Sequence, residues 1–473
     1  MMNKSIQTQP IFGQTRHIHM VGIGGIGMSG MAEILLLKDY KVTGSDANKG
    51  ETIPRLEKLG AEISIGHDAE NIEGADVVVY TSAVKAEENI ETKAALEQGI
   101  PVIKRAEMLA ELMRMKYGIG IAGTHGKTTT TTLTGHVVQD GSFDPTIIVG
   151  GKVHSFSKTN AVVGEGDIFV VEADEFDRTF LRLSPSLAVI TNVEADHLDI
   201  YDNLDDVKQA FIDFANKVPF YGAVVLCLDD SNVRSIIPQI DRRIISYGLT
   251  PQAQIRAVDI EPDQFNTTFT VLNNDEKLGD ITLKAPGEHN VKNALAAVAI
   301  GIELNIKFEE IKSGLERYEG VFRRFQLKAE IDDIMVIDDY AHHPTEVQAT
   351  LDAARSGWED RRIIAVFQPH LYSRTQNLYK EFGLSFFDAE VCVITDVYPS
   401  REEPIEGVTG KLIADAAKEY GHRQVYYVED KKALPAKLKD LAQPGDVIIT
   451  MGAGDIYEYG QEFVNILEKK EHE

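Results

Sequence analysis

The chain has 473 residues, of which 43% are hydrophobic and 26% charged, and its formal net charge is −26. This length exceeds what one hydrophobic core can organise, so two to four domains are expected. The negative charge argues against general nucleic-acid binding, which needs clustered Lys and Arg side chains. No apolar run reaches the ~18 residues of a membrane span, and the amino-terminal residues lack the apolar core of a signal peptide. We therefore expect no membrane insertion and a cytoplasmic protein.

Short apolar strands, each followed by a turn and a helical pattern, recur along the whole chain, as in "RHIHMVGIGG", "DIFVVEADE" and "DVIITMGAGD". This alternation predicts α/β domains with parallel sheets. We expect an N-terminal Rossmann-like domain over 1–115, a central P-loop ATPase-like domain over 116–322 and a C-terminal Rossmann-like domain over 323–473. The two cysteines lie in apolar runs and are expected to be buried, reduced thiols.

The first glycine-rich loop, "HMVGIGGIGMSGMA", contains Gly22, Gly24 and Gly27 in the spacing G-x-G-x-x-G, after a strand and before a helix. Glycines let backbone N–H groups approach a diphosphate at a helix N-terminus. Asp46 follows at the distance expected for an acid that binds a ribose. The loop suits NAD and a nucleotide-sugar diphosphate equally well, and tight helix packing is the purely structural alternative.

The second glycine-rich loop, "GTHGKTTTTTL", ends like the Walker A pattern G-x-x-x-x-G-K-[ST], but Ile121 stands where that pattern begins with glycine. Lys127 would contact the β- and γ-phosphates of ATP, and the Thr128 hydroxyl would bind Mg²⁺. Six of the seven residues from Thr128 to Thr134 are threonine. Because threonine is a poor helix former, we attribute this run to local function rather than stability.

Acidic residues follow two later strands, in "DIFVVEADEFD" and "SLAVITNVEADHLD". Carboxyl ends of parallel strands meet at one sheet edge, and carboxylates with a histidine can hold Mg²⁺ and a second metal ion. A hydride-transfer enzyme needs only the first loop, whereas an ATP-driven reaction on a substrate that carries a diphosphate needs both. Farther on, residues 250–286 are rich in β-branched residues and predict a small antiparallel insert in the central domain.

Seven segments together resemble the Mur ligases: "GTHGKTTT", "EADEFD", "TNVEADHLD", "GEHNVKNALAA", "GVFRRFQ", "DDYAHHPTE" and "FQPHLYSRT". The resemblance covers nearly the whole chain and implies that GTHGKT is a complete, short P-loop. The first glycine-rich loop and "DDYAHHPTE" point to the member that joins L-alanine to the lactyl carboxylate of UDP-N-acetylmuramate. That reaction consumes ATP, passes through an acyl phosphate and belongs to cytoplasmic peptidoglycan precursor synthesis.

The resemblance implies four sets of site residues, which overlap. The UDP-sugar would be bound by Gly22, Gly24, Gly27, Asp46, His67, Ser82, His370 and Arg374. ATP would be bound by Gly123, Thr124, His125, Gly126, Lys127, Thr128, Thr129, Asn192, Asn290, Asn293, Arg324 and Asp339. The amino acid would meet Tyr340 and His342, and two Mg²⁺ ions would be held by Thr128, Glu172 and His197. The catalytic residues would be Lys127, His197, Arg324 and His342, the last as general base or amine orienter.

Three positions depart from the family pattern. Leu371 stands where some relatives have arginine, Phe176 replaces a common serine, and Ile212 occupies the place of a carbamylated lysine. The alternative function is a recycling ligase that attaches a murein tripeptide to the same UDP-sugar. A binding protein that senses the UDP-sugar and a dehydrogenase are the more distant alternatives.

Overall fold

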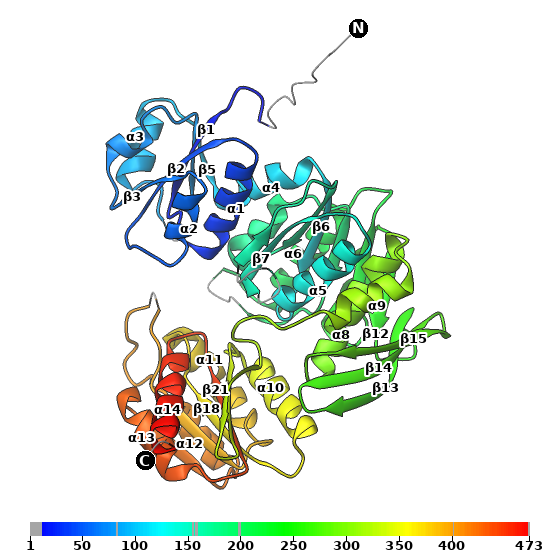
Figure 1. Cartoon of the computed structure of the whole chain (residues 1–473), viewed down its shortest axis with the longest axis vertical. Coiled ribbons are helices and arrows are strands. Elements are labelled where there is room, and N and C mark those ends of the chain that lie inside the picture. The colour runs from blue at the N-terminus through cyan, green and yellow to red at the C-terminus, as the bar shows by residue number, and fades with distance from the viewer. Residues whose placement is uncertain are drawn as a thin grey trace. The chain divides into compact units, whose positions relative to one another are not determined.

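The computed structural model describes residues 12–81, 84–153, 156, 159–196, 200–400 and 402–471. Three sheets flanked by helices follow one another along the chain (Figure 1). The chain divides into two compact units, one of Met1–Arg256, Leu272–Leu278 and Lys292–Arg317, the other of Ala257–Val271, Gly279–Val291 and Tyr318–Glu473. The division passes through the strands of the expected antiparallel insert.

The N-terminal sheet is entirely parallel, with strand order β3-β2-β1-β4-β5. Its strands are β1 (His17–Val21), β2 (Lys41–Asp46), β3 (Glu62–Ile65), β4 (Val77–Tyr80) and β5 (Val102–Lys104). Its helices are α1 (Ile26–Leu37), α2 (Ile53–Lys58), η1 (Ala69–Ile72), α3 (Ile90–Glu97) and α4 (Arg105–Arg114). The strand order reverses at β1, and the first glycine loop follows the carboxyl end of this strand. Ligands of parallel α/β sheets bind at such a position.

The central sheet has the order β15-β14-β13-β12-β11-β10-β6-β9-β7-β8. Its strands are β6 (Tyr117–Ala122), β7 (Thr146–Val153), β8 (Thr159–Val162), β9 (Ile168–Glu172), β10 (Leu187–Ile190), β11 (Ala223–Cys227), β12 (Ile244–Gly248), β13 (Ile255–Asp263), β14 (Asn266–Asn273) and β15 (Glu276–Leu283). Its helical segments are α5 (Lys127–Asp140), η2 (Phe176–Arg182), α6 (Leu204–Asn216), α7 (Ser231–Ile236), η3 (Ile237–Gln239), α8 (Glu288–Glu303) and α9 (Phe308–Glu316). Two-residue links join β13, β14 and β15, which makes them antiparallel. The expected insert is present.

Helix α5 shows why a helix can carry so many threonines. Thr131 and Thr132 donate their hydroxyls to the carbonyls of Lys127 and Thr128, at 2.8 Å each. Thr130 donates to Asn293 Oδ1 at 3.1 Å. These bonds satisfy buried hydroxyl groups inside the helix packing. The threonine run therefore contributes to packing, which the sequence interpretation had set aside in favour of local function.

The C-terminal sheet has the order β16-β17-β21-β18-β19-β20, and its edge strand β16 is antiparallel to β17. The strands are β16 (Gln326–Ile331), β17 (Ile334–Asp339), β18 (Arg362–Phe367), β19 (Val391–Thr395), β20 (Val425–Val428) and β21 (Asp446–Met451). The helices are α10 (Pro344–Gly357), α11 (Tyr372–Leu384), α12 (Lys411–Glu419), η4 (Lys431–Ala433), α13 (Leu434–Leu441) and α14 (Ile456–Glu471). Successive residues on β17, Val336 and Ile337, belong to separate apolar cores on the two faces of this sheet.

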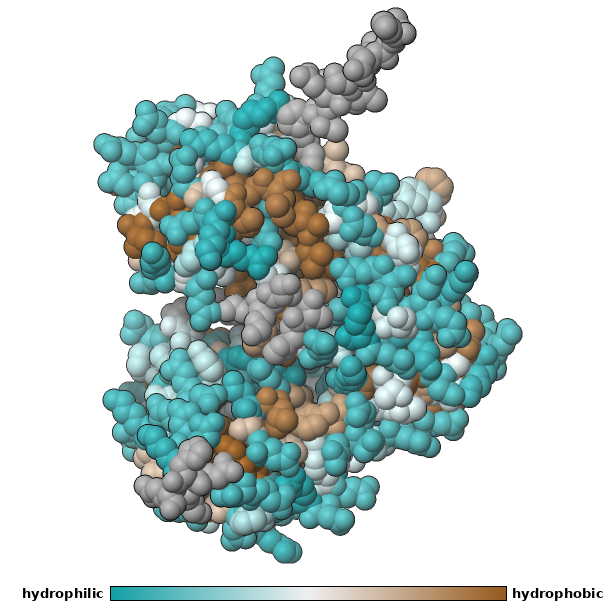
Figure 2. All heavy atoms as spheres, viewed as in Figure 1, coloured by the Kyte–Doolittle hydropathy of each residue, from teal (hydrophilic) through white to brown (hydrophobic). Residues whose placement is uncertain are grey.

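The predicted fold class, three α/β domains with an antiparallel insert in the central one, is confirmed. Cys227 and Cys392 are buried free thiols, as expected. Among the described helices, none combines the length and the apolar character needed to cross a bilayer. Hydrophilic residues predominate on the face shown in Figure 2.

Candidate active site

The second glycine loop connects β6 to α5, and β6 lies between β9 and β10 in the sheet. Gly123 has φ +139°, and a Cβ atom there would lie 1.9 Å from Thr191 Oγ1. Gly126 has φ +81° at the start of α5, and a Cβ atom there would lie 2.5 Å from Asn293 Oδ1. The backbone conformation and the close neighbours both require glycine at these two positions. The short loop therefore keeps the glycines that its geometry needs.

The end of strand β10 braces this loop. Asn192 Oδ1 accepts the His125 backbone N–H at 2.8 Å, and Asn192 Nδ2 donates to the His125 carbonyl at 3.1 Å. Thr124 Oγ1 accepts the Glu194 N–H at 2.9 Å. Asn192 was predicted to contact ATP, and in the structure its side chain holds the loop through these two hydrogen bonds to the His125 backbone. These bonds hold the conformation in which the helix N-terminus can face an anion.

Lys127 forms a buried ion pair with Glu175. Its Nζ lies 2.7 and 2.9 Å from the two carboxylate oxygens and also donates to the Gly123 carbonyl at 2.7 Å. Burial alone would lower the pKa of Lys127, but Glu175 and the other nearby carboxylates raise it above its usual value. The ammonium group is therefore charged at neutral pH. Sequence reasoning placed Glu175 among the strand-end acids without giving it a role.

Thr128 and Glu172 form an oxygen pair at the same helix start. Thr128 Oγ1 lies 3.0 and 3.1 Å from the two Glu172 oxygens, and the Gly150 N–H donates to Glu172 Oε2 at 2.7 Å. Glu172 ends β9, the direct neighbour of β6. Burial is the main cause that raises the pKa of the Glu172 carboxyl. A hydroxyl and a carboxylate side by side fit the preference of Mg²⁺ for oxygen ligands. His197, the third predicted ligand, lies outside the described residues.

Helix α8 carries Asn290 and Asn293, two of the predicted ATP contacts. Asn293 is buried, accepts the Thr130 hydroxyl and lies against Gly126. Asn290, one helical turn earlier, donates to the Pro286 carbonyl at 2.8 Å. Thr129 is buried in the first turn of α5. Asn293 thus lies directly beside the start of α5, the helix predicted to bind phosphate.

The first glycine loop connects β1 to α1, and its glycines also have close neighbours. A Cβ atom on Gly22, whose φ is +78°, would lie 2.7 Å from Thr81 Cγ2. Asp46, predicted to contact a ribose, accepts the Gly24 N–H at 2.9 Å through Oδ2. A Cβ atom on Gly27 would lie 2.3 Å from Nη1 of Arg105, the first residue of α4. A guanidinium group therefore packs against the loop, and the sequence analysis missed it.

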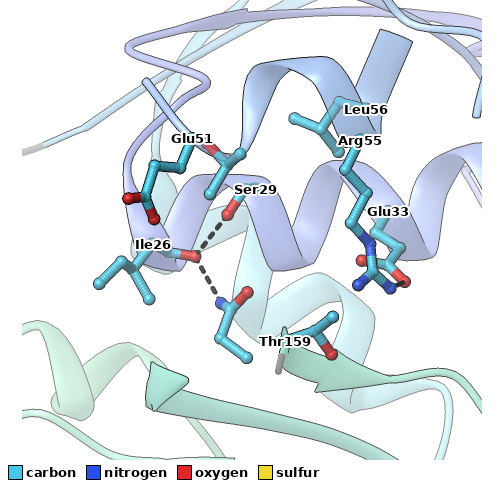
Figure 3. A pocket seen from close by; sticks show the side chains of 9 residues that line it. Ile26, Ser29, Glu33, Glu51, Arg55, Leu56 and Thr159 are labelled. Atoms are coloured by element: carbon cyan, nitrogen blue, oxygen red, sulfur yellow. Dashed lines mark hydrogen bonds and ion pairs between the residues drawn. The ribbon is translucent and has the colours of Figure 1, made fainter. Parts of the chain in front are cut away.

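A cavity of about 140 Å³ lies beside α1 and α2 (Figure 3). Two acids, Glu33 and Glu51, line it, and Arg55 pairs with Glu33 at 2.6 Å. Asn160 on β8 donates to the Ile26 carbonyl and so connects the start of α1 to the central sheet. The two carboxylates make this cavity a poor place for a phosphate. Ser82, predicted for the UDP-sugar, lies outside the described residues, and His67 follows β3.

In the second unit, predicted residues gather at the carboxyl ends of β17 and β18. The Asp339 carboxylate accepts the N–H groups of Phe325 and Ala341 at 2.7 Å each. Burial raises the pKa of Asp339 to about 6, and nearby Arg324 opposes the shift. The Arg324 guanidinium carbon lies 5.4 Å from the centre of the Tyr340 ring. The predicted ATP contacts Arg324 and Asp339 are therefore close neighbours within this unit.

Glu346, on α10, lies close to both Arg324 and His342. The sequence analysis did not identify it as a site residue. Its Oε1 lies 3.6 Å from Arg324 Nη1, and its Oε2 lies 3.2 Å from His342 Nδ1. The His342 ring centre lies 6.1 Å from that of His370. The arrangement therefore combines one carboxylate, one guanidinium and two imidazoles.

The three departures from the family pattern have distinct environments. Leu371 caps α11 with φ +69°, an unusual conformation for a side chain of its size. Arg374 lies in the first turn of that helix and is half-buried. The Phe176 N–H donates to Asp174 Oδ1 at 3.1 Å. Ile212 is buried in the apolar core beneath α6, where its side chain packs with other apolar groups.

Comparisons with known proteins agree over the full length. The model of the Mur ligase family, catalytic domain, matches residues 17–117. The Mur ligase middle domain matches 121–301, and the Mur ligase, glutamate ligase domain, matches 323–454. The chain therefore belongs to the Mur ligase family.

Individual relatives indicate which members of this family the chain resembles. The chain is 56% identical to a UDP-N-acetylmuramate–L-alanine ligase of Salinibacter ruber, over 98% of this chain and 97% of the relative. The crystal structure of UDP-N-acetylmuramate-alanine ligase MurC from Thermotoga maritima matches with a TM-score of 0.80 and 30% identity, over 97% and 100% of the two chains. A murein peptide ligase from Psychrobacter arcticus matches with a TM-score of 0.68 and 25% identity, over 96% and 98%.

Proposed function

We propose that this chain is an ATP-dependent ligase that joins L-alanine to the lactyl carboxylate of UDP-N-acetylmuramate. The observation that carries this proposal is the full-length 56% identity to a ligase named for that reaction. The geometry supports it, because the first unit holds two separate glycine loops, each at the carboxyl end of a central strand. One loop serves the nucleotide carrier and the other the energy source. We propose domain boundaries near residues 115 and 322.

ATP would bind at the second loop. The Lys127 ammonium and the N-terminus of α5 would hold its phosphates, and Asn293 would lie close to the nucleotide. Thr128 and Glu172 would hold a Mg²⁺ ion, and His197 would share a second one. The metal ions would neutralise charge on the phosphate oxygens.

The UDP-sugar would bind at the first loop. Gly22, Gly24 and Gly27 leave the backbone open to the diphosphate, and Arg105 adds the positive charge that the sequence analysis lacked. Asp46 holds the loop through Gly24. Because a guanidinium group recognises phosphate oxygens in a planar, bidentate manner, Arg105 is our first choice for the diphosphate.

The reaction would proceed in two steps. The lactyl carboxylate attacks the γ-phosphorus of ATP, and an acyl phosphate and ADP form. The amine of L-alanine then attacks the acyl carbon, and the tetrahedral intermediate expels phosphate as the amide bond forms. Glu346 and the Tyr340 carbonyl hold Nδ1 of His342. The other ring nitrogen, Nε2, would therefore take the proton from the attacking amine.

The test is to incubate the protein with ATP, Mg²⁺, UDP-N-acetylmuramate and, separately, L-alanine, glycine, L-serine and the murein tripeptide. Product masses and released phosphate are measured. We expect the L-alanyl product and its equivalent of phosphate. A preference for the tripeptide would instead identify a recycling ligase, and the Psychrobacter arcticus relative is named a murein peptide ligase. Hydride transfer to NAD without phosphate release would refute both.

A further inference from the structure

A fully buried carboxylate lies beneath the carboxyl edge of the N-terminal sheet. Glu91 is in the first turn of α3, and its side chain has 0% exposure. The Asn89 side chain caps this helix by accepting the N–H groups of Glu91 and Thr92. Acidic side chains are almost never fully buried unless they are paired or hydrogen-bonded. The partners of Glu91 therefore indicate what the carboxylate does.

Four polar side chains surround Glu91: Ser45, His67 and Asn71 form hydrogen bonds with it, and His19 Nε2 lies 3.7 Å from its Oε1. Its Oε2 accepts the Ser45 hydroxyl at 2.6 Å and lies 3.0 Å from His67 Nδ1. Its Oε1 accepts from Asn71 Nδ2 at 2.6 Å. Burial would raise the pKa of Glu91, but the side chains around it, with His19 the largest contributor, lower it to about 2. The carboxylate is therefore ionised at neutral pH and can only accept hydrogen bonds.

This arrangement decides which nitrogen of His67 carries a proton. Nδ1 faces the Glu91 carboxylate and also lies 3.0 Å from Ser45 Oγ, whose own proton is donated to Glu91. Both neighbours are therefore acceptors, and Nδ1 must be the donor. In neutral imidazole Nε2 then carries the lone pair, and no residue in the described part of the chain bonds it.

His67 has the exposure that a ligand contact requires. Its side chain is 28% exposed, although Nδ1 faces a fully buried group. Two residues before it, Ile65 ends β3 and is 53% exposed. An exposed acceptor with an exposed aliphatic side chain close to it in the chain suits a flat heterocycle with a hydrogen-bond donor.

We propose that Glu91 is a positioning residue for UDP-sugar binding, because it fixes His67 with Nδ1–H inward and Nε2 outward as an acceptor for a donor group of the uridine. The inference rests on the proposed function for the identity of the nucleoside. Three donors on uridine have the right chemistry: the imide N–H of the base and the 2′- and 3′-hydroxyls of the ribose.

The first experiment needs no variant of Glu91. Full-length protein labelled with ¹⁵N-histidine is recorded by NMR near pH 8, and His67→Gln identifies the His67 signals. We expect a protonated Nδ1 and an unprotonated Nε2, with the Nε2 shift changing when UDP is added. An unprotonated Nδ1 would overturn the proposal, and so would an Nε2 signal that UDP leaves unchanged.

The second experiment uses Glu91→Gln, whose amide can donate to His67 Nδ1 and so permits the opposite tautomer. We expect the Kd for UDP and the KM for the UDP-sugar to rise about tenfold, as loss of one hydrogen bond predicts. We expect kcat and the KM for ATP to change little. In the His67→Gln background the same substitution should add almost nothing. A full effect in that background, or an equal rise in the KM for ATP, would reduce Glu91 to a structural role.

UDP analogues separate the three donors, since 3-methyl-UDP lacks the imide N–H, 2′-deoxy-UDP lacks the 2′-hydroxyl and 3′-deoxy-UDP lacks the 3′-hydroxyl. Weaker binding of one analogue to the wild type, with no difference in Glu91→Gln, identifies the donor. Equal binding of UDP and all three analogues overturns the proposal. These binding and NMR measurements do not use ligase activity, so a protein that binds UDP in this manner but forms no amide would refute the proposed function alone.

Discussion

The buried pair of Lys127 and Glu175 gives the sharpest quantitative test of the phosphate site. Glu175 is 2% exposed and the Lys127 side chain 13%, so solvent screens the pair little. Lys127→Met keeps most of the side-chain volume but leaves the Glu175 carboxylate buried without its ammonium partner. Removal of one member of a buried pair costs about 3–5 kcal/mol of stability. With roughly 2–4 °C per kcal/mol for a domain of this size, the midpoint of thermal unfolding should fall by roughly 6–20 °C.

Glu175→Gln should cost less than Lys127→Met. The Lys127 ammonium would keep its bonds to the carbonyls of Gly123 and Thr124, and the charge of Glu172 would remain nearby. The double variant should be more stable than Lys127→Met alone, because neither charge is then left buried without its partner. Thermal unfolding of the full chain, followed by calorimetry, measures all four proteins.

A surface pair provides the matched control. Lys411 and Asp415 form an ion pair on α12, and their side chains are 59% and 53% exposed. Lys411→Met should therefore change the unfolding midpoint by about 2 °C or less. If Lys127→Met has an equally small effect, or if its effect and that of Glu175→Gln simply add in the double variant, the two side chains do not form the buried pair described above.

Three further predictions test other parts of the molecule. Gly123→Ala should abolish stabilisation by ATP, because its Cβ atom would lie 1.9 Å from a neighbouring oxygen, whereas Gly99→Ala, with positive φ but open space, should retain it in a thermal-shift assay. Arg105→Ala should raise the KM for the UDP-sugar about tenfold with that for ATP unchanged, as loss of a charge-assisted bond predicts. Arg114→Ala, at the exposed end of the same helix, should change neither constant, and equal effects of the two substitutions would contradict the role of Arg105. Asp339 holds its proton up to about pH 6 in the folded protein but only to about pH 4 when unfolded. The folded state therefore binds more protons between these values, so stability should fall by about 2 kcal/mol as pH rises from 4 to 6. Asp339→Asn should remove this part of the pH dependence of urea unfolding.

The glycine loops and the strands before them could be predicted from sequence because their signals are local. A run such as "YGIGIAGTHGKT" contains a strand, the glycines of the turn and the first residues of the helix within a few positions. The closeness of Thr128 and Glu172 followed from the rule that parallel strands end at one sheet edge, and β6 and β9 are indeed neighbours.

The partners that hold the site residues could not be predicted in the same way. Glu175 is 48 residues from Lys127 in the chain, and Glu91 is 24 residues from His67. No spacing rule selects these acids among the 74 acidic residues of the chain, because the contact depends on how loops pack at the sheet edge. Arg105 had a weak signal, since in "IKRAEML" it directly follows Lys104, the last residue of β5 in the same sheet.

The electrostatics of the second loop link nucleotide binding to a cation. Lys127 is surrounded by the carboxylates of Glu175, Asp174 and Glu172, so the loop has more negative than positive side chains before any phosphate arrives. A nucleotide triphosphate would add further negative charge within a few ångströms, where the effective dielectric constant is low and repulsion is strong. The helix N-terminus and one ammonium group offset only part of that charge. If phosphate binds at this loop, it would require either displacement of Glu175 or a divalent cation next to Glu172, and the oxygen pair formed with Thr128 is where such a cation would fit.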